Sequence, residues 1–479
     1  MPLLAVAATL VTLALAVSDA WPALRGPAPY PPEWQWPRRS TAVGPLGPAL
    51  AAGLAVLGLI AISSLAKARR LAVPAAIALG FAFQLAILGL EPEGPMPAVM
   101  SQTVYRTATS YLTVAASEQA RDPLGFLRRH HELLPELRKT GKHASTHPPG
   151  PVLFFRGLIA ACERWPSLTR AVLLSGGFEE SNPRRPRPQH PAPVRAAALL
   201  GGLLIAFAGA ATAWPIERLA RAAGSDPPSA ARVAALWAVV PAAALMTPML
   251  DQALCLPVAG AAACLATAAA RPGPAARRWA AAAGVLGGLA AHLSYGAPVF
   301  LALGGLAALA PTLTSREAAR RALALALIAA AVAAALWCLP AALGHHPLTS
   351  LRTALAIHRD EYTQPRRYPL WLAFNLVDLA MFLGVPVAVA WVLRIARSAR
   401  RFPRGPVDRL RLATAAGLAA LVLSGVTRGE VGRLWLPLMP LLLVAALARP
   451  GGPGRGESLV YGAALAALTI TMALYWQVP

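Results

Sequence analysis

Long apolar runs alternate with short polar segments along almost the whole chain. A helix needs about 20 mainly apolar residues to cross a bilayer, and most of these runs approach that length. The pattern therefore predicts an all-α polytopic membrane protein with about 13 transmembrane helices. The expected spans are residues 3–19, 47–66, 71–90, 194–214, 230–248, 252–270, 279–294, 296–311, 319–342, 370–393, 410–426, 431–448 and 458–476.

One polar segment is much longer than the others and divides the chain into three parts. Residues 1–90 hold the first three expected helices, residues 91–193 form a large loop, and residues 194–479 hold the remaining helices. Within the loop, apolar residues recur at helical spacing over 122–139, which predicts an amphipathic helix lying along the membrane interface. Long loops are usually functional or disordered, so this loop is the first place to look for a site.

Composition supports the membrane assignment. The chain is 56% hydrophobic and 14% charged, whereas soluble domains carry about 25% charged residues. Its formal net charge is +23, but the basic residues are almost all arginines and no basic domain interleaved with aromatic residues is present. Nucleic acid is therefore not expected as a partner. Abundant alanine, and arginine in place of lysine, suggest a bacterial inner (cell) membrane protein.

The arginines indicate the orientation of the helices. Arginine-rich segments follow the second, fourth, sixth, eighth and tenth expected spans, and all of them fall on one side if the N-terminus is cytoplasmic. These segments are residues 67–70, 218–232, 271–278, 316–321 and 394–411. The large loop and the other chemically interesting segments then lie on the extracytoplasmic side, which we expect to be the active face.

The most informative motif in the large loop is His143-Ala-Ser-Thr-His147-Pro-Pro-Gly150. The two prolines restrict φ and cannot donate hydrogen bonds, and the glycine permits a sharp bend, so His147 should be held in a defined pose. We expect His143 and His147 to bind a phosphate-bearing head group. A His pair at this spacing would also suit a metal on a helix, but the prolines end any helix and no third ligand is evident. No metal ligand is assigned, and a divalent cation stays an open alternative.

A second cluster stands at the entrance of the twelfth expected span. Arg428 and Arg433 flank Glu430, and two guanidinium groups this close suit bidentate recognition of phosphate. The alternative is a surface Arg–Glu pair that caps the helix. Four further candidates come from other external segments or from inside a span. They are Asp251, which alternatively caps its helix, Glu33, Tyr295, and the intramembrane Asp378, which alternatively forms a structural ion pair.

These features together resemble the GT-C superfamily of polytopic membrane glycosyltransferases, most closely its protein-mannosyltransferase-like branch. The resemblance rests on the large external loop, the His147-Pro-Pro turn before a returning apolar helix, and Pro248-Met-Leu-Asp251. It implies transfer of a sugar from a polyprenyl-phosphate-linked donor to a glycan, lipid or protein acceptor. Asp251, Glu430 and Glu33 are then candidates for the catalytic base, and His143, His147, Arg428, Arg433, Tyr295 and Asp378 for substrate and phosphate binding.

The chain departs from that family at one position. The family's first large external loop normally begins with a catalytic Asp, whereas residues 100–105 here contain no carboxylate. Two other classes therefore stay open, a multi-pass transporter and a non-catalytic membrane protein. Carriers place polar residues midway along broken helices, whereas the polar residues here gather at one face, which favours an enzyme.

Two expectations follow from this interpretation. His143, His147, Asp251 and Arg433 should surround one external cavity. Replacing Arg433 with alanine should impair transfer and leave folding intact, because the residue is expected at a helix end.

Overall fold

The computed structural model describes residues 2–63, 66–104, 110–141, 143–178, 190–400 and 405–477, and throughout these residues the chain is helical with no strand. The only extended pairing there is an isolated antiparallel bridge between Arg38 and Trp476. Residues 105–109, the connector 179–189 and the arginine-rich residues 401–404 lie outside the described residues. The all-α prediction is confirmed for the part of the chain that the structure describes.

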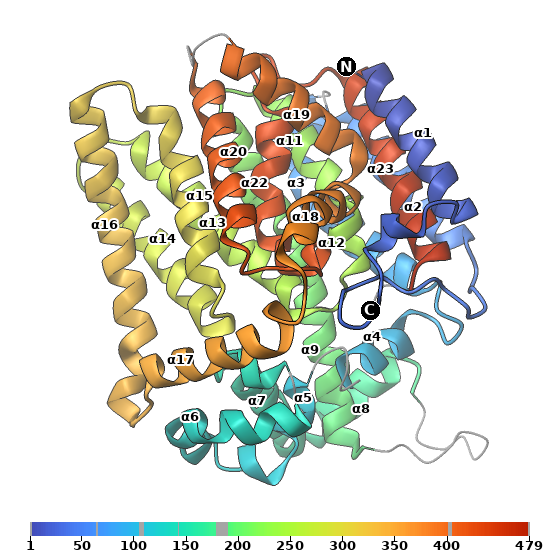
Figure 1. Cartoon of the computed structure of the whole chain (residues 1–479), viewed down its shortest axis with the longest axis vertical. Helices are drawn as coiled ribbons and strands as arrows, with labels where there is room; N and C mark the ends of the chain where they lie inside the picture. Colours follow the sequence, from blue (N-terminus) through green and yellow to red (C-terminus); the bar gives the residue numbers. More distant parts are fainter. Residues whose placement is uncertain are drawn as a thin grey trace.

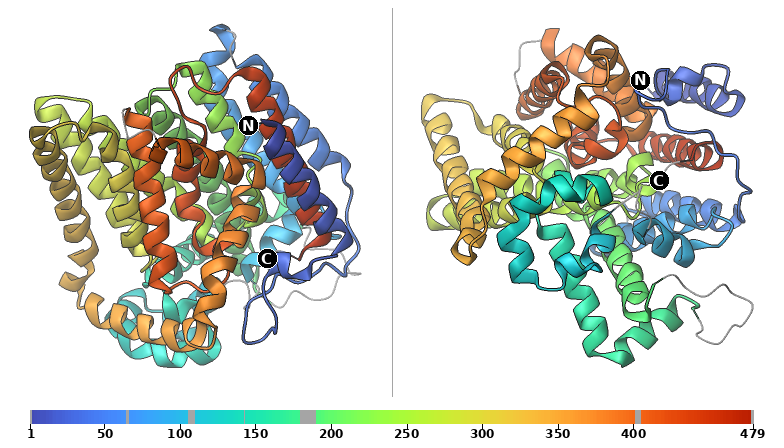
Figure 2. Two further views of the ribbon diagram at one scale, coloured as in Figure 1. Left: turned by 45° about the horizontal axis from the view of Figure 1, so that its top comes forward. Right: turned by 60° about the horizontal axis from the view of Figure 1, so that its bottom comes forward.

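The chain begins with apolar helices packed at one side of a bundle (Figure 1). These elements are α1 (Pro2–Ser18), η1 (Pro22–Arg25), α2 (Gly47–Ile62) and α3 (Ala66–Leu88). Next come short helices gathered at one end of the molecule, at the bottom of Figure 1 and of the left view of Figure 2. They are α4 (Pro95–Val104), α5 (Tyr111–Ala115), η2 (Glu118–Ala120), α6 (Pro123–Thr140), η3 (Ala144–Thr146), α7 (Gly150–Arg164) and α8 (Pro166–Ser175). The large loop is thus mostly helical, and the predicted amphipathic helix 122–139 is α6.

The rest of the bundle follows. Its first half contains α9 (Ala192–Ala211), α10 (Ala213–Ala222), α11 (Pro227–Trp237), α12 (Pro241–Leu245), α13 (Leu250–Ala269), α14 (Gly273–Leu293), α15 (Ala297–Leu309), η4 (Ala310–Thr312) and α16 (Arg316–Cys338). Its second half contains η5 (Leu339–Leu343), α17 (Pro347–His358), η6 (Arg359–Thr363), α18 (Tyr368–Leu383), α19 (Val385–Arg400), α20 (Pro406–Ser424), α21 (Val431–Leu434), η7 (Leu436–Leu438), α22 (Met439–Leu447) and α23 (Arg455–Tyr475).

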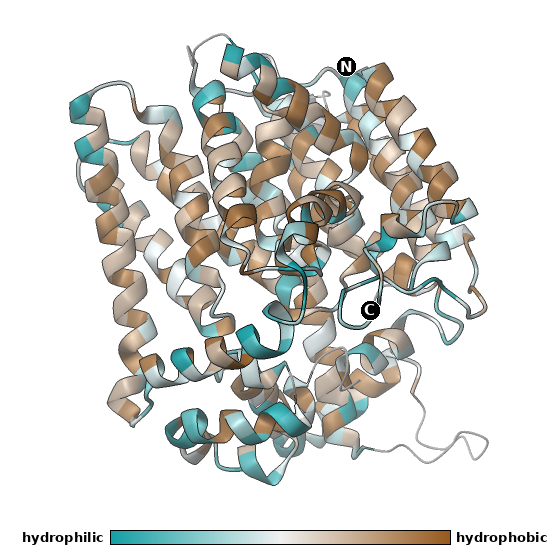
Figure 3. Ribbon diagram, viewed as in Figure 1, coloured by the Kyte–Doolittle hydropathy of each residue, from teal (hydrophilic) through white to brown (hydrophobic). Residues whose placement is uncertain are grey.

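Within the described residues, five helices are long and apolar enough to cross a membrane, and a sixth qualifies if one bent pair is taken as a single span. The five are residues 70–88, 192–222, 250–269, 316–343 and 455–475. Several other apolar helices are shorter than a span. Figure 3 shows the apolar helices in the bundle and more polar residues on α6 and at the helix ends. A membrane protein with several spanning helices is supported, and the count of 13 stays a prediction.

Three of the expected spans are broken into shorter or sharply bent helices. Residues 230–248 are divided between α11 and α12, because Pro241 starts a new helix instead of continuing the old one. Residues 370–393 form α18 and α19, which meet at an angle of 117°. The break falls at Gly384, whose φ of +95° lies in a region that favours glycine. Residues 431–448 contain three short helices, and the last two have prolines near their starts.

One of the arginine-rich segments lies at the end of the bundle away from the large loop. The N-terminal end of α16, which carries Arg316, Arg320 and Arg321, lies at the end opposite α17 and α6 (Figure 1). The short helices of the 91–193 segment gather at the α17 end. The assignment of either end to a side of the membrane stays a prediction.

Candidate functional site

A small cavity of about 40 Å³ lies where three segments distant in sequence meet. These segments are the turn at η3, the α17–η6 region and the connection between α20 and α21. The lining residues are His143, Thr146, His147, His358, Tyr362, Arg366, Thr427, Arg428, Glu430, Arg433 and Leu434. The volume suits a few water molecules, so a larger ligand needs side chains of the wall to turn aside.

Local hydrogen bonds hold His147 at the cavity. Its Nδ1 lies 2.9 Å from the carbonyl oxygen of His143, and the hydroxyl of Thr146 donates to that same oxygen at 3.1 Å. The ring also meets Tyr111 edge to face, with 5.3 Å between ring centroids. The turn η3 is therefore the local structure that keeps the two histidines of the motif together.

The Pro-Pro-Gly sequence fixes the direction in which the chain leaves His147. Gly150 begins α7 and lies against the backbone of α14, where an added Cβ would come within 2.0 Å of the His292 carbonyl oxygen. Only glycine permits this close approach. The motif is thus anchored to the bundle immediately after its second histidine.

The opposite wall is the connection between α20 and α21, and α18 holds it in place. The amide of Asn375 donates to the Thr427 carbonyl oxygen at 2.8 Å and accepts from the Gly429 N–H at 3.2 Å. Asp378 accepts from the N–H of Val431 at 2.7 Å and from that of Gly432. Asn375 and Asp378 thus position the backbone of this wall. The described contacts of Asp378 are hydrogen bonds from N–H groups, so the alternative of a structural ion pair is not what the structure shows.

Glu430 occupies a strained backbone position at this wall. Its φ is +57°, in the left-handed region that non-glycine residues rarely adopt. Such strain persists only where surrounding contacts impose it, and it is concentrated at functional sites. The conformation orients the carboxylate toward two arginines.

Four buried charges form the centre of the site. Arg433 Nη2 donates to Glu430 Oε2 at 2.6 Å, and its Nη1 lies 3.5 Å from Asp251 Oδ2. Arg366 Nη2 contacts the other oxygen of Glu430 at 3.3 Å. Asp251, Glu430 and Arg433 are 7%, 8% and 9% exposed. Residues separated by up to 182 positions in sequence therefore form one charge network.

Burial and the neighbouring charges set the protonation states of Glu430, His147 and His358 at the cavity. Burial raises the pKa of Glu430, but Arg433 and Arg366 outweigh burial and hold that pKa at about 2. Burial, with a smaller contribution from His143, lowers the pKa of His147 to about 3. Burial also lowers the pKa of His358. At neutral pH the cavity therefore presents an ionised Glu430 and neutral imidazoles at His147 and His358.

Arg428 lines the cavity but its guanidinium binds backbone. It donates to the carbonyl oxygens of Gly425, Thr363 and Arg366 at 3.1, 3.0 and 2.6 Å. These bonds connect the α20–α21 connection to η6. Phosphate recognition by the predicted pair Arg428 and Arg433 would require Arg428 to give up these bonds.

Arg366 occupies the position that sequence reasoning gave to Arg428. Its guanidinium lies over the ring of Trp34, 5.7 Å from the centroid, and one nitrogen donates to the Arg428 carbonyl oxygen. The end of α17 and the π-helical turn η6 that follows it bring His358 and Tyr362 to the same wall. Isolated π-helical turns are frequent at functional sites. Arg366 belongs to the polar segment 350–369, and the sequence alone does not reveal which arginine faces the cavity.

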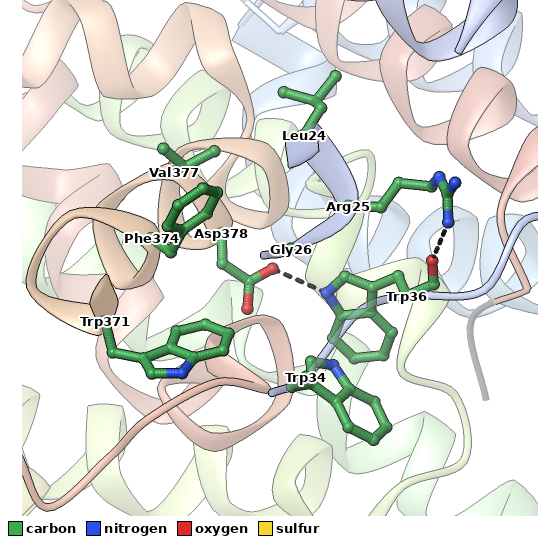
Figure 4. A pocket seen from close by; sticks show the side chains of 9 residues that line it. All are labelled: Leu24, Arg25, Gly26, Trp34, Trp36, Trp371, Phe374, Val377 and Asp378. Carbon is green, nitrogen blue, oxygen red and sulfur yellow. Dashed lines mark hydrogen bonds between the residues drawn. The ribbon is translucent and has the colours of Figure 1, made fainter. Parts of the chain in front are cut away.

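Glu33 supports the site from behind. One of its oxygens accepts from Arg367 Nε at 2.8 Å and the other from Trp371 Nε1 at 2.7 Å. Burial raises the pKa of Glu33, but the hydrogen bonds from Arg367 and Trp371 outweigh burial and lower it. Figure 4 shows the neighbouring cluster, in which Asp378 accepts from Trp36 Nε1 at 2.8 Å beside Trp34 and Trp371. Glu33 is fully occupied in this role, which argues against it as the base.

Tyr295 lies outside the cavity. It packs against Leu134, Ala354 and Ile357, at the contact between α6 and α17. His130 Nδ1 lies 3.2 Å from the Ser350 hydroxyl at the same contact. The structure therefore brings His143, His147, Glu430 and Arg433 to one cavity and leaves Tyr295 and Glu33 elsewhere. Asp251 was expected to line the same cavity, but it reaches the site only through its contact with Arg433.

The described residues contain no group of three or more His, Cys, Asp or Glu side chains arranged to hold a metal ion. A scan of the chain against protein-family models found no match. A search of curated proteins found no match either.

Proposed function

We propose that the protein is a membrane glycosyltransferase that moves a sugar from a polyprenyl-phosphate-linked donor to an acceptor hydroxyl at the extracytoplasmic face. The observation that carries this proposal is the meeting of buried arginines, a strained glutamate and neutral histidines in one cavity. Such a transfer needs cations for the departing phosphate and a proton acceptor for the attacking hydroxyl. The cavity offers groups suited to both tasks.

Arg366 is the cation best able to receive the phosphate. Its contact with Glu430 is longer, at 3.3 Å, than the 2.6 Å contact made by Arg433. Arg433 is also committed to the carboxylate of Asp251, whereas the other contacts of Arg366 are with the Arg428 carbonyl oxygen and the face of Trp34, neither of which is an anion. A phosphate can therefore replace Glu430 at Arg366 while Arg433 keeps Glu430 ionised and in place.

The test measures transfer and donor binding with the purified full-length protein in lipid vesicles. A panel of polyprenyl-phosphate-linked hexoses and pentoses is supplied as donor. In Arg366→Gln the transfer rate should fall by about 10²–10³, the usual effect of losing one preorganised donor to a developing negative charge. Arg359→Gln is the matched control, because Arg359 belongs to the same segment and makes an exposed contact with Asp360.

The outcomes separate the alternatives. Turnover by the wild type together with its loss in Arg366→Gln supports the proposal. Absence of both donor binding and turnover with every donor overturns it. Equal loss in Arg366→Gln and Arg359→Gln would show that the cavity is not the site.

One observation favours the second candidate function, transport. The α18–α19 pair is bent by 117° within an apolar stretch, and broken spanning helices are common in transporters. However, Asp378 in α18 already accepts hydrogen bonds from Trp36, Val431 and Gly432, which leaves little capacity for a coupling ion. Donor-dependent sugar flux across vesicles without covalent transfer would favour the transporter.

A further inference from the structure

The carboxylates at the site are poorly suited to accept a proton. Both oxygens of Glu430 are paired with arginines and would have to leave those guanidinium groups to reach an acceptor hydroxyl. Asp251 contacts Arg433 and is not among the described residues that line the cavity. The residues 100–104 at the start of the large loop contain no carboxylate. A base for the proposed transfer has to come from another residue type.

His147 has a proton-acceptor atom whose identity follows from its hydrogen bonds. The Nδ1 atom lies 2.9 Å from a carbonyl oxygen, which can only accept, so Nδ1 carries the hydrogen. In a neutral imidazole the other nitrogen, Nε2, then holds a free lone pair. His147 lines the cavity together with Glu430 and Arg366. His147 is therefore a cavity-lining residue with a nitrogen able to accept a proton.

The ring is also held as a catalytic base must be. The His143 carbonyl fixes the tautomer of His147, and Tyr111 packs edge to face with the imidazole ring. Gly150 anchors the chain that follows His147. A carbonyl or carboxylate that orients the far nitrogen is the usual partner of a basic histidine. His358 has a looser version of this arrangement, with Nδ1 3.4 Å from the Thr363 hydroxyl. The better-oriented ring is His147.

We propose, building on the transferase function, that Nε2 of His147 accepts the proton of the acceptor hydroxyl. The hydroxyl oxygen forms a bond to the anomeric carbon of the donor sugar while the bond from that carbon to the phosphate oxygen breaks. The bonding electron pair leaves with the polyprenyl phosphate, which Arg366 binds, and the proton moves to Nε2. The imidazolium then returns the proton to water, so atoms and charge balance over the cycle.

This role differs from the phosphate-binding role that the sequence suggested for His147. A phosphate ligand would be a cationic imidazolium, whereas burial lowers the pKa of His147 to about 3. A cationic histidine would make turnover rise as the pH falls below the ordinary histidine value of about 6.5. A neutral base predicts turnover that holds nearly level between pH 7.5 and 4.5 and declines only at lower pH.

The experiment compares wild type, His147→Gln and His147→Ala in vesicles, with polyprenyl-phosphate-linked sugars as donors. Glutamine keeps a hydrogen-bond acceptor near the Nε2 position but is not basic, so turnover should fall by about 10²–10⁴. Donor binding should stay within about threefold of wild type. Added imidazole should partly restore His147→Ala, because removal of the ring leaves space beside Tyr111. His131→Gln on α6 serves as the control.

Each result decides a different question. Full turnover by His147→Gln with an unchanged pH profile overturns the base while the transferase stands. Loss of donor binding by His147→Gln, comparable with that of Arg366→Gln, overturns the base in favour of a phosphate ligand. Absence of any turnover by wild type overturns the transferase, and with it the base. If His147→Gln fails to fold, imidazole rescue of His147→Ala decides the matter.

Discussion

Arg433 is both a candidate site residue and a structural one, and its replacement should destabilise the fold. The guanidinium lies between Glu430 and Asp251, at 2.6 and 3.5 Å, and is 9% exposed. Arg433→Ala would leave two buried carboxylates without this partner. The sequence-based expectation that folding survives this change assumed an exposed helix end, and the burial of Arg433 reverses it.

The magnitude follows from what remains after the change. Removing one partner of a buried ion pair costs about 3–5 kcal/mol, because the other charge is left uncompensated. Arg366 still contacts Glu430 at 3.3 Å, so we expect Arg433→Ala to lie near the lower end, about 3 kcal/mol. Glu430→Gln removes one of the stranded charges, so the double variant should recover about 1–3 kcal/mol of that loss through coupling between the sites.

The assay is SDS titration of the purified protein in mild-detergent micelles, read as the free energy of unfolding for wild type, both single variants and the double variant. Arg359→Ala is the control, because an exposed pair contributes only about 0–1 kcal/mol. Strictly additive losses in the double variant would refute the reasoning, since they would mean that Arg433 does not stabilise the protein through Glu430.

Two further predictions concern topology and pH. In a Cys338→Ser background, which removes the exposed native thiol, single cysteines at Arg70 and Arg400 should be labelled from the side opposite to cysteines at Arg121 and Arg128; labelling of all four from one side would contradict the orientation. Burial lowers the pKa of His130 to about 3, so the unfolded chain binds a proton near pH 6.5 before the folded chain does, and stability should fall as the pH decreases from about 6.5 toward 3. His130→Asn removes this titration, so its apparent unfolding temperature should decline less steeply between pH 7.5 and 4.5, and an unchanged slope would contradict the assignment.

The candidate site was only partly readable from the sequence. The His143–His147 motif and the Arg428–Arg433 cluster each indicated a site. In both, polar residues that are rare in apolar chains stand beside prolines or glycines, which restrict the backbone or permit sharp bends. Their partnership with Asp251 could be expected from helix ends meeting at one face. Arg366 could not be chosen over Arg428, since both are arginines in external polar segments. Only the folded chain shows that Arg428 binds three carbonyl oxygens while Arg366 faces Glu430.

The sequence by itself determined the helical class and the membrane setting, because apolar run length and residue periodicity act locally along the chain. It also determined the amphipathic helix α6, for the same reason. The burial of Arg433 and its pairing with Asp251 were decided by the tertiary structure. Both depend on which distant group lies opposite the residue, and a carboxylate 182 positions away in the chain leaves no local trace in the pattern.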